Sequence, residues 1–121
     1  MRRVHILNTN KSYDKTCEED MLRGQKCSAY FGHWKHLIET IKMGDLVFLY
    51  SNGNGIIARG VATGIVEIAD YQGKENEEYY MHLDRFEILN PYLSSTEIKI
   101  VTNMNIDLTK RYSTLQNMKL V

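Results

Sequence analysis

The sequence has few cysteines and no excess of charge, and both shortages limit what the protein can do. Its 121 residues include 15 basic and 15 acidic side chains, so the formal net charge is zero. The strong positive field that drives non-specific nucleic-acid binding is therefore excluded, and any such binding must come from a local patch or pocket. Cys17 and Cys27 cannot form a four-ligand zinc site, and no His-x-x-x-His lies nearby. We expect two small buried hydrophobes in a reducing compartment, and no cofactor.

Long apolar runs and targeting signals are also lacking. The longest runs, "LVFLY" and "GIIARGVATGIV", are too short or too interrupted to cross a bilayer, and "MRRVHILN" has no signal-peptide core. There is one proline, and no linker, repeat or low-complexity tract is present. The composition, 43% apolar and 25% charged, is close to the globular average. The sequence predicts one cytoplasmic domain over residues 1–121, with no membrane partner.

The first part of the chain predicts a strand and two helices. "VHILNT", residues 4–9, is apolar and β-branched, as in a strand. Thr16 and Glu19 have the spacing of a capping box, which predicts a short helix ending near Gly24. Residues 27–45 predict a second helix, because four apolar residues recur there at helical spacing and a glycine follows: Trp34, Leu37, Ile38 and Ile41, then Gly44.

The middle of the chain predicts a hairpin. "DLVFLYS", residues 45–51, and "GIIARGVATGIVEI", residues 55–68, indicate two strands joined by a turn at residues 52–55. Small residues fall on one face of the second strand, where a helix or a ligand could approach the backbone closely: Ala58, Gly60, Ala62 and Gly64. An acidic run around this region is expected to form a solvated face: Glu67, Asp70, Glu75, Glu77 and Glu78.

The last part of the chain predicts one long strand and two short helices. Residues 77–89 change their apolar register near Asp84 and Arg85, which indicates a bulge. Capping-box spacings predict a helix after Pro91, from Ser94 and Glu97, and a last helix from Ser113 and Gln116. The elements together predict an α+β fold, in which short helices flank a small, curled, mixed β-sheet or partial barrel.

Motifs for catalysis or phosphate binding are absent. Gly55 and Gly60 have the glycine spacing of a P-loop, but Val61 follows where lysine is required, so a hairpin turn is the better interpretation. No serine or cysteine has a nucleophile-elbow context. His33 and His36 are one helical turn apart, but no carboxylate completes a metal site, and exposed polar residues are the simpler explanation. We therefore predict that the protein is not an enzyme.

Aromatic and amide side chains gather at predicted strand ends. Asn8 and Asn10 close the first strand, and Ser51 and Asn52 follow Tyr50. If these strands are neighbours, amides and hydroxyls meet aromatic rings at one edge of the sheet. A flipped base is held in this way, since rings stack on it and polar groups read its edge.

Three segments resemble the PUA-like superfamily, and within it the EVE and YTH domains. They are "HILNTNKSYD", "FGHWKHLIETIKMGDLVFLYSNG" and "GIIARGVATGIV", and the resemblance covers about residues 4 to 90. It implies a curled sheet whose pocket reads a modified base in DNA or RNA, as in recognition modules of modification-dependent restriction systems. It also implies that Trp34 and Tyr50 are pocket walls, with Asn8, Thr9, Ser51 and Asn52 at the edge. Tyr30 or Phe31 could supply a second wall.

The leading hypothesis is thus a non-catalytic reader of a flipped, modified base, acting alone or within a larger effector complex. The expected base pocket is Asn8, Thr9, Asn10, Phe31, Trp34, Tyr50, Ser51 and Asn52. The expected phosphate contacts are Arg2, Arg3, Lys11, Lys35, Lys42, Lys110 and Arg111. Two alternatives stay open: a sensor or sponge for a free nucleotide or metabolite, and a protein-interaction module in which the aromatic residues form the core.

Overall fold

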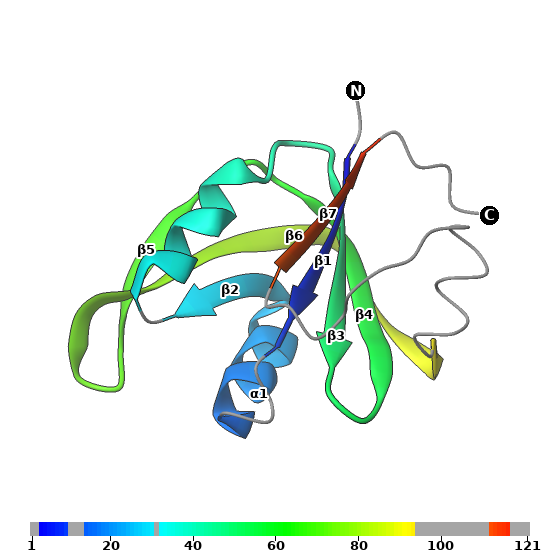
Figure 1. Cartoon of the computed structure of the whole chain (residues 1–121), viewed down its shortest axis with the longest axis horizontal. Coiled ribbons are helices and arrows are strands. Elements are labelled where there is room, and N and C mark those ends of the chain that lie inside the picture. The colour runs from blue at the N-terminus through cyan, green and yellow to red at the C-terminus, as the bar shows by residue number, and fades with distance from the viewer. Residues whose placement is uncertain (1–2, 10–13, 31, 94–111, 117–121) are drawn as a thin grey trace.

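In the residues that the structure describes, the fold is a curled sheet with two short helices, an α+β arrangement in the form of a half-barrel (Figure 1). The computed structural model describes residues 3–9, 14–30, 32–93 and 112–116. Seven strands pair in the order β2-β6-β4-β3-β1-β7, and β5 also pairs with β6. The pairing of β1 with β3 is parallel and the other pairings are antiparallel, so the sheet is mixed, as predicted.

Strand β1 (Arg3–Asn8) and helix α1 (Lys15–Gly24) confirm the first two predicted elements. The predicted capping residue is wrong by two positions. Asp14, with extended backbone, caps the helix, and its carboxylate accepts the backbone N–H of Thr16 at 2.9 Å. Gln25 ends the helix in the left-handed conformation.

The helix predicted over residues 27–45 is wrong in its first part. Residues Lys26–Tyr30 form strand β2, which pairs with β6, and a 3₁₀ helix, η1 (Gly32–Thr40), follows. Of the apolar residues at helical spacing, Trp34, Leu37 and Ile38 belong to η1 and Ile41 follows it. Ile38 and Ile41 are buried in the core. The prediction carried the helix upstream of these residues, where the long-range pairing with β6 forms a strand instead.

The predicted hairpin is confirmed by β3 (Leu46–Ser51) and β4 (Gly55–Ala62). The second predicted strand is broken, because residues 63–66 separate β4 from β5 (Glu67–Tyr71). The small-residue face predicted for this strand leaves no space at Gly60 for a helix or a ligand. A Cβ atom there would lie 2.6 Å from Cβ of Leu83 on β6, so the glycine lets two strands of the sheet come together.

Strand β6 (Lys74–Leu93) is long enough to pair with three other strands. The predicted bulge is confirmed: Val61 faces Asp84 and Arg59 faces Glu87, and Arg85 between them has a φ of +52°. The predicted helix at Ser94 and Glu97 lies outside the described residues. The last predicted helix is wrong at its start, since β7 (Tyr112–Gln116) is a strand antiparallel to β1.

The central sheet has an apolar cluster on each of its two faces. Leu7, Val47 and Leu49 belong to the larger cluster, which also contains Cys17 and Met21 of α1 and residues of η1 and β6. The smaller cluster is on the other face: Val4, Ile6, Phe48 and Ile56. Alternation along β1 and β3 therefore decides which face each polar residue at the strand ends joins.

Candidate functional site

The ends of β1 and β3 meet at one edge of the sheet, as the leading hypothesis requires. The two strands are parallel neighbours, with Asn8 opposite Tyr50, so their carboxyl ends coincide. The backbone N–H of Thr9 donates to the Tyr50 carbonyl at 2.9 Å and extends the pairing by one residue. Nδ2 of Asn8 donates to Oδ1 of Asn52 at 3.4 Å, which joins the strand end to the hairpin turn. We call Asn8, Tyr50 and Asn52 the amide edge.

The predicted pocket residues of these strands do not share one face. Tyr50 packs on the smaller cluster. Asn8 lies on the same face, because it is two residues after Ile6 of that cluster. Thr9 and Ser51 fall on the opposite face, which α1 covers, and both are completely buried. A ligand that touches the amide edge is therefore separated from Thr9 and Ser51 by the sheet itself.

Thr9 and Ser51 have structural hydrogen bonds. The Thr9 hydroxyl donates to a carboxylate oxygen of Glu18 at 2.8 Å, which fastens α1 to the end of β1. The Ser51 hydroxyl accepts from Nδ2 of Asn54 at 3.2 Å, and the Asn54 N–H donates to the Ser51 carbonyl at 3.0 Å. These contacts position the amide edge and fix the turn that holds Asn52.

The other predicted pocket residues are only partly described. Asn10 and Phe31 lie outside the described residues. The backbone of Trp34 belongs to η1, which contacts β2 and β6, but the Trp34 side chain lies outside the described part. Tyr30 is fully buried, its ring 4.4 Å from that of Tyr71 between centroids, so it belongs to the core.

The predicted phosphate contacts are spread over the molecule. Arg3 begins β1, at the opposite end of the strand from Asn8. Lys35 on η1 donates to the Asn76 carbonyl at 2.9 Å, and Lys42 is exposed and donates to the Glu39 carbonyl. Arg2, Lys11, Lys110 and Arg111 lie outside the described residues. The three that are described thus surround no common point beside the amide edge.

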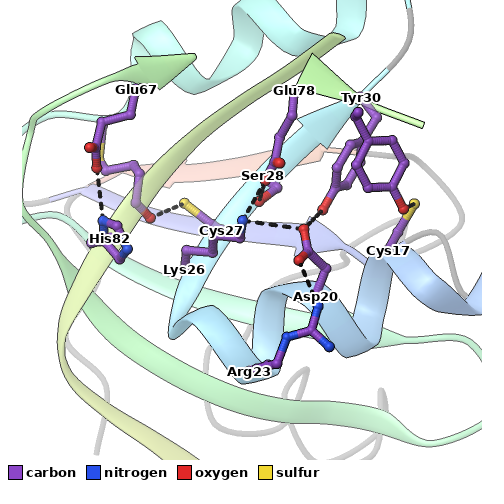
Figure 2. A network of polar contacts seen from close by, with 12 residues as sticks. Cys17, Asp20, Arg23, Lys26, Cys27, Ser28, Tyr30, Glu67, Glu78 and His82 are labelled. Carbon is purple, nitrogen blue, oxygen red and sulfur yellow. Dashed lines mark hydrogen bonds and ion pairs between the residues drawn. The ribbon is translucent and has the colours of Figure 1, made fainter. Parts of the chain in front are cut away.

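A second polar cluster, which the sequence did not indicate, lies between α1, β2 and β6 (Figure 2). Nζ of Lys26 is 2.7 Å from Oε2 of Glu78 and 3.2 Å from Oδ2 of Asp20. The hydroxyls of Ser28 and Tyr30 donate to the same two carboxylates, Ser28 to Glu78 and Tyr30 to Asp20. We call these five residues the lysine network. Its Lys26 and Glu78 side chains are only 12% and 5% exposed.

The charges in the lysine network stabilise one another. Burial alone lowers the pKa of Lys26, but the carboxylates of Glu78 and Asp20 outweigh it, so the pKa is raised. Burial opposes ionisation of Asp20 as well, yet Lys26, Tyr30 and Arg23 hold its pKa below the ordinary value. The prediction that the acidic run is a solvated face is therefore wrong for Glu78, which is buried.

A third cluster joins the starts of β1 and β3. Nε2 of the fully buried His5 is 2.8 Å from Oδ2 of Asp45, which also accepts the N–H of Lys42. The other carboxylate oxygen accepts the N–H of Arg3. Burial lowers the pKa of His5 despite Asp45, and these donors lower the pKa of Asp45 despite its own burial. A neutral His5 with its proton on Nε2 therefore donates to an ionised Asp45.

The cysteines are free and buried, as predicted, and burial raises the pKa of Cys27 to about 12. His36 is exposed and 3.1 Å from Glu39, whereas the His33 side chain lies outside the described part. Within the described ranges, no three histidine, cysteine or acidic side chains are arranged to hold a metal ion. Nor does any helix in those ranges have the length and apolarity to cross a membrane.

Comparisons with protein-family models, with curated proteins and with solved structures found no match to this chain.

Proposed function

We propose that the chain is a PUA-like, non-catalytic module that binds one base of DNA or RNA, in modified form, at the amide edge. The observation that supports this proposal is the parallel pairing of β1 with β3, which brings Asn8 and Asn52 together beside the ring of Tyr50. Amides at the end of a strand pair can read the edge of a base, and an aromatic ring beside them can stack on its face.

The amide edge has the properties of a binding surface rather than of a core. The bond between Asn8 and Asn52 is long at 3.4 Å, so it contributes little to stability and can be exchanged for bonds to a ligand. Tyr50 and Asn52 are half-buried, which leaves part of each accessible, whereas Asn8 is buried behind them. An amide carries both donors and an acceptor, so a pair of them can match the mixed pattern along a base edge.

In this proposal Tyr50 supplies the stacking surface, and the buried Thr9 and Ser51 position the edge without touching the base. Trp34 is left out of this site, because its helix η1 contributes Ile38 to the larger cluster on the opposite face. This assigns different roles to residues that adjoin in the sequence. Contacts to the base would account for most of the discrimination between modified and unmodified oligonucleotides, because a protein of zero net charge attracts phosphates only weakly.

Binding of paired oligonucleotides, identical except for one modified base, tests the proposal. Tyr50→Ala should weaken binding of the preferred oligonucleotide about 5- to 100-fold, the range expected for one stacked base. Asn52→Ala should lessen the preference between the two oligonucleotides. Lys74→Ala is the control, since Lys74 is exposed at the start of β6, away from the turn that holds Asn52. If all four proteins bind both oligonucleotides equally, the proposal is wrong.

A thermal-shift screen with free nucleosides separates this function from its nearest alternative. A pocket for a base in a strand should also respond weakly to the free nucleoside. A response to a free nucleotide combined with no binding of any oligonucleotide would indicate a metabolite sensor or sponge instead.

A further inference from the structure

A small cavity lies on the sheet at the bulge of β6, away from the amide edge. Its volume is about 220 Å³, and its lining is Leu46, Arg59, Gly60, Val61, Arg85 and Glu87. Ligand pockets for drug-sized molecules start at about 300 Å³, so this cavity suits a single small group. Two guanidinium groups against one carboxylate give the lining a net positive charge.

We propose that this cavity binds a phosphate group through Arg59 and Arg85. Guanidinium groups bind phosphate oxygens with paired, charge-assisted hydrogen bonds, and two of them on neighbouring strands can hold one group from two sides. The proposal stands apart from the proposed reading of a base, because it needs only the phosphate.

The backbone at Arg85 supports a functional role. Its φ of +52° is a conformation that arginine rarely adopts, and it occurs where two residues of β6 oppose one residue of β4. A bulge of this kind changes the direction of a side chain, and strained residues concentrate at binding sites. In the described part of the chain, the Arg85 side chain has no hydrogen bond or ion pair.

Arg59 is held only weakly by its present partner. Nη2 of Arg59 is 3.3 Å from Oε2 of Glu87, and both side chains are about half exposed. Surface pairs of this kind add little to stability, so a phosphate can compete with Glu87 for the guanidinium group. Asp84, next to Arg85, is exposed but does not line the cavity.

The cavity is on the same face of the sheet as the amide edge. Arg59 lies opposite Phe48, and Val61 lies opposite Leu46, on the face of the smaller cluster. Leu46 is four residues before Tyr50 on β3, a separation of about 13 Å along the strand. The phosphate can therefore belong either to the backbone of a bound strand or to a free phosphate compound.

The test uses inorganic phosphate and a single-stranded oligonucleotide as separate probes. Phosphate should shift the NMR signals of the Arg59 and Arg85 side chains, and the double variant R59Q/R85Q should weaken its binding about tenfold or more. Glu87→Gln removes the competing carboxylate and should tighten phosphate binding about two- to fivefold. The matched control is R23Q/K74Q, which removes two exposed positive charges elsewhere.

The oligonucleotide identifies the source of the phosphate. If the group belongs to a bound strand, R59Q/R85Q should reduce the slope of log affinity against log salt by about 0.7, and the control variant should not. Phosphate binding without this change of slope supports the cavity as a site for a free phosphate compound. The proposal is overturned if R59Q/R85Q and R23Q/K74Q bind both probes alike, and that result leaves the base site untouched.

Discussion

The amide edge lies at the ends of two strands, and the lysine network lies between α1, β2 and β6. Both are polar clusters, but they differ in the length of their hydrogen bonds and in the exposure of their side chains. Asn8, which is buried, and Asn52, which is half-buried, are joined by a long bond of 3.4 Å. Lys26 is joined to Glu78 at 2.7 Å beneath α1, with two hydroxyls on the same carboxylates (Figure 2). In the described part of the chain, no buried side-chain nitrogen or oxygen lacks a partner.

This difference indicates separate uses for the two clusters. A short, buried and fully paired network is costly to break, because removing one charge leaves the other desolvated. A long bond at a partly accessible edge costs little to exchange. We therefore expect mutations in the lysine network to change stability and mutations at the amide edge to change binding.

The largest effect is expected in the lysine network. Lys26→Met keeps much of the side-chain volume but leaves the buried Glu78 carboxylate with Ser28 and no positive charge, and Asp20 loses the same partner. We expect the free energy of unfolding to fall by about 3 kcal/mol, measured by urea denaturation.

Lys74→Met on the same strand as Glu78 is the control, because Lys74 is exposed. It should change the free energy of unfolding by about 0.5 kcal/mol or less. If the two variants are equally stable, the lysine network does not hold α1 on the sheet.

The lysine network also shows what the sequence could not reveal about the fold. Lys26 and Ser28 alternate with the core residues Cys27 and Ala29, which is a strand pattern. That pattern remained hidden because a helical spacing follows directly, and because the partner of both polar residues is Glu78, about fifty positions away. The strand β7 was missed for the same reason, since only its pairing with β1 overrides the capping-box spacing of Ser113 and Gln116.

The amide edge was more accessible to prediction. The strands, the hairpin turn and the bulge at Arg85 follow local alternation and turn residues, and the structure confirms them. The pairing of β1 with β3 could be stated only as a condition, because the parallel partner of a strand is not encoded locally. Asn8 and Thr9 lie on opposite faces because side chains alternate along a strand. The predicted pocket did not take this alternation into account.

The next largest effect concerns pH and the His5–Asp45 pair. Folded His5 has a lowered pKa, so the unfolded chain takes up a proton near pH 6.5 while folded His5 stays neutral. Stability is therefore complete above pH 6.5 and decreases as pH falls, by up to about 1.4 kcal/mol per pH unit. The lowered pKa of Asp45 adds a further loss below about pH 4.

Urea denaturation between about pH 7.5 and about pH 5.5 measures this slope, since those limits are about one unit above and below the ordinary histidine pKa. His5→Gln keeps a donor for Asp45 and should remove most of the slope, whatever its effect on stability at pH 7.5. His36→Gln is the control, since His36 is exposed. An unchanged slope in His5→Gln would show that another group titrates.

The smallest effect on stability is expected at Asn52 of the amide edge, and Thr9, which is buried on the opposite face, should behave differently. Thr9→Val removes the buried hydroxyl that donates to Glu18 at 2.8 Å and should cost about 1 to 2 kcal/mol in urea denaturation. Asn52→Ala shortens a half-buried side chain in the turn, which includes loss of the 3.4 Å bond to Asn8, and should cost less, about 0.5 kcal/mol.

Binding of the preferred oligonucleotide should reverse this order. Asn52→Ala should lose affinity with little loss of stability, because Asn52 is partly accessible to a ligand, whereas Thr9→Val should keep its affinity at temperatures where it stays folded. The two residues are on opposite faces, so a ligand on one face cannot contact both. If Thr9→Val instead loses affinity without losing stability, the ligand binds on the α1 face, and the binding role passes from Asn8 and Asn52 to Thr9 and Ser51.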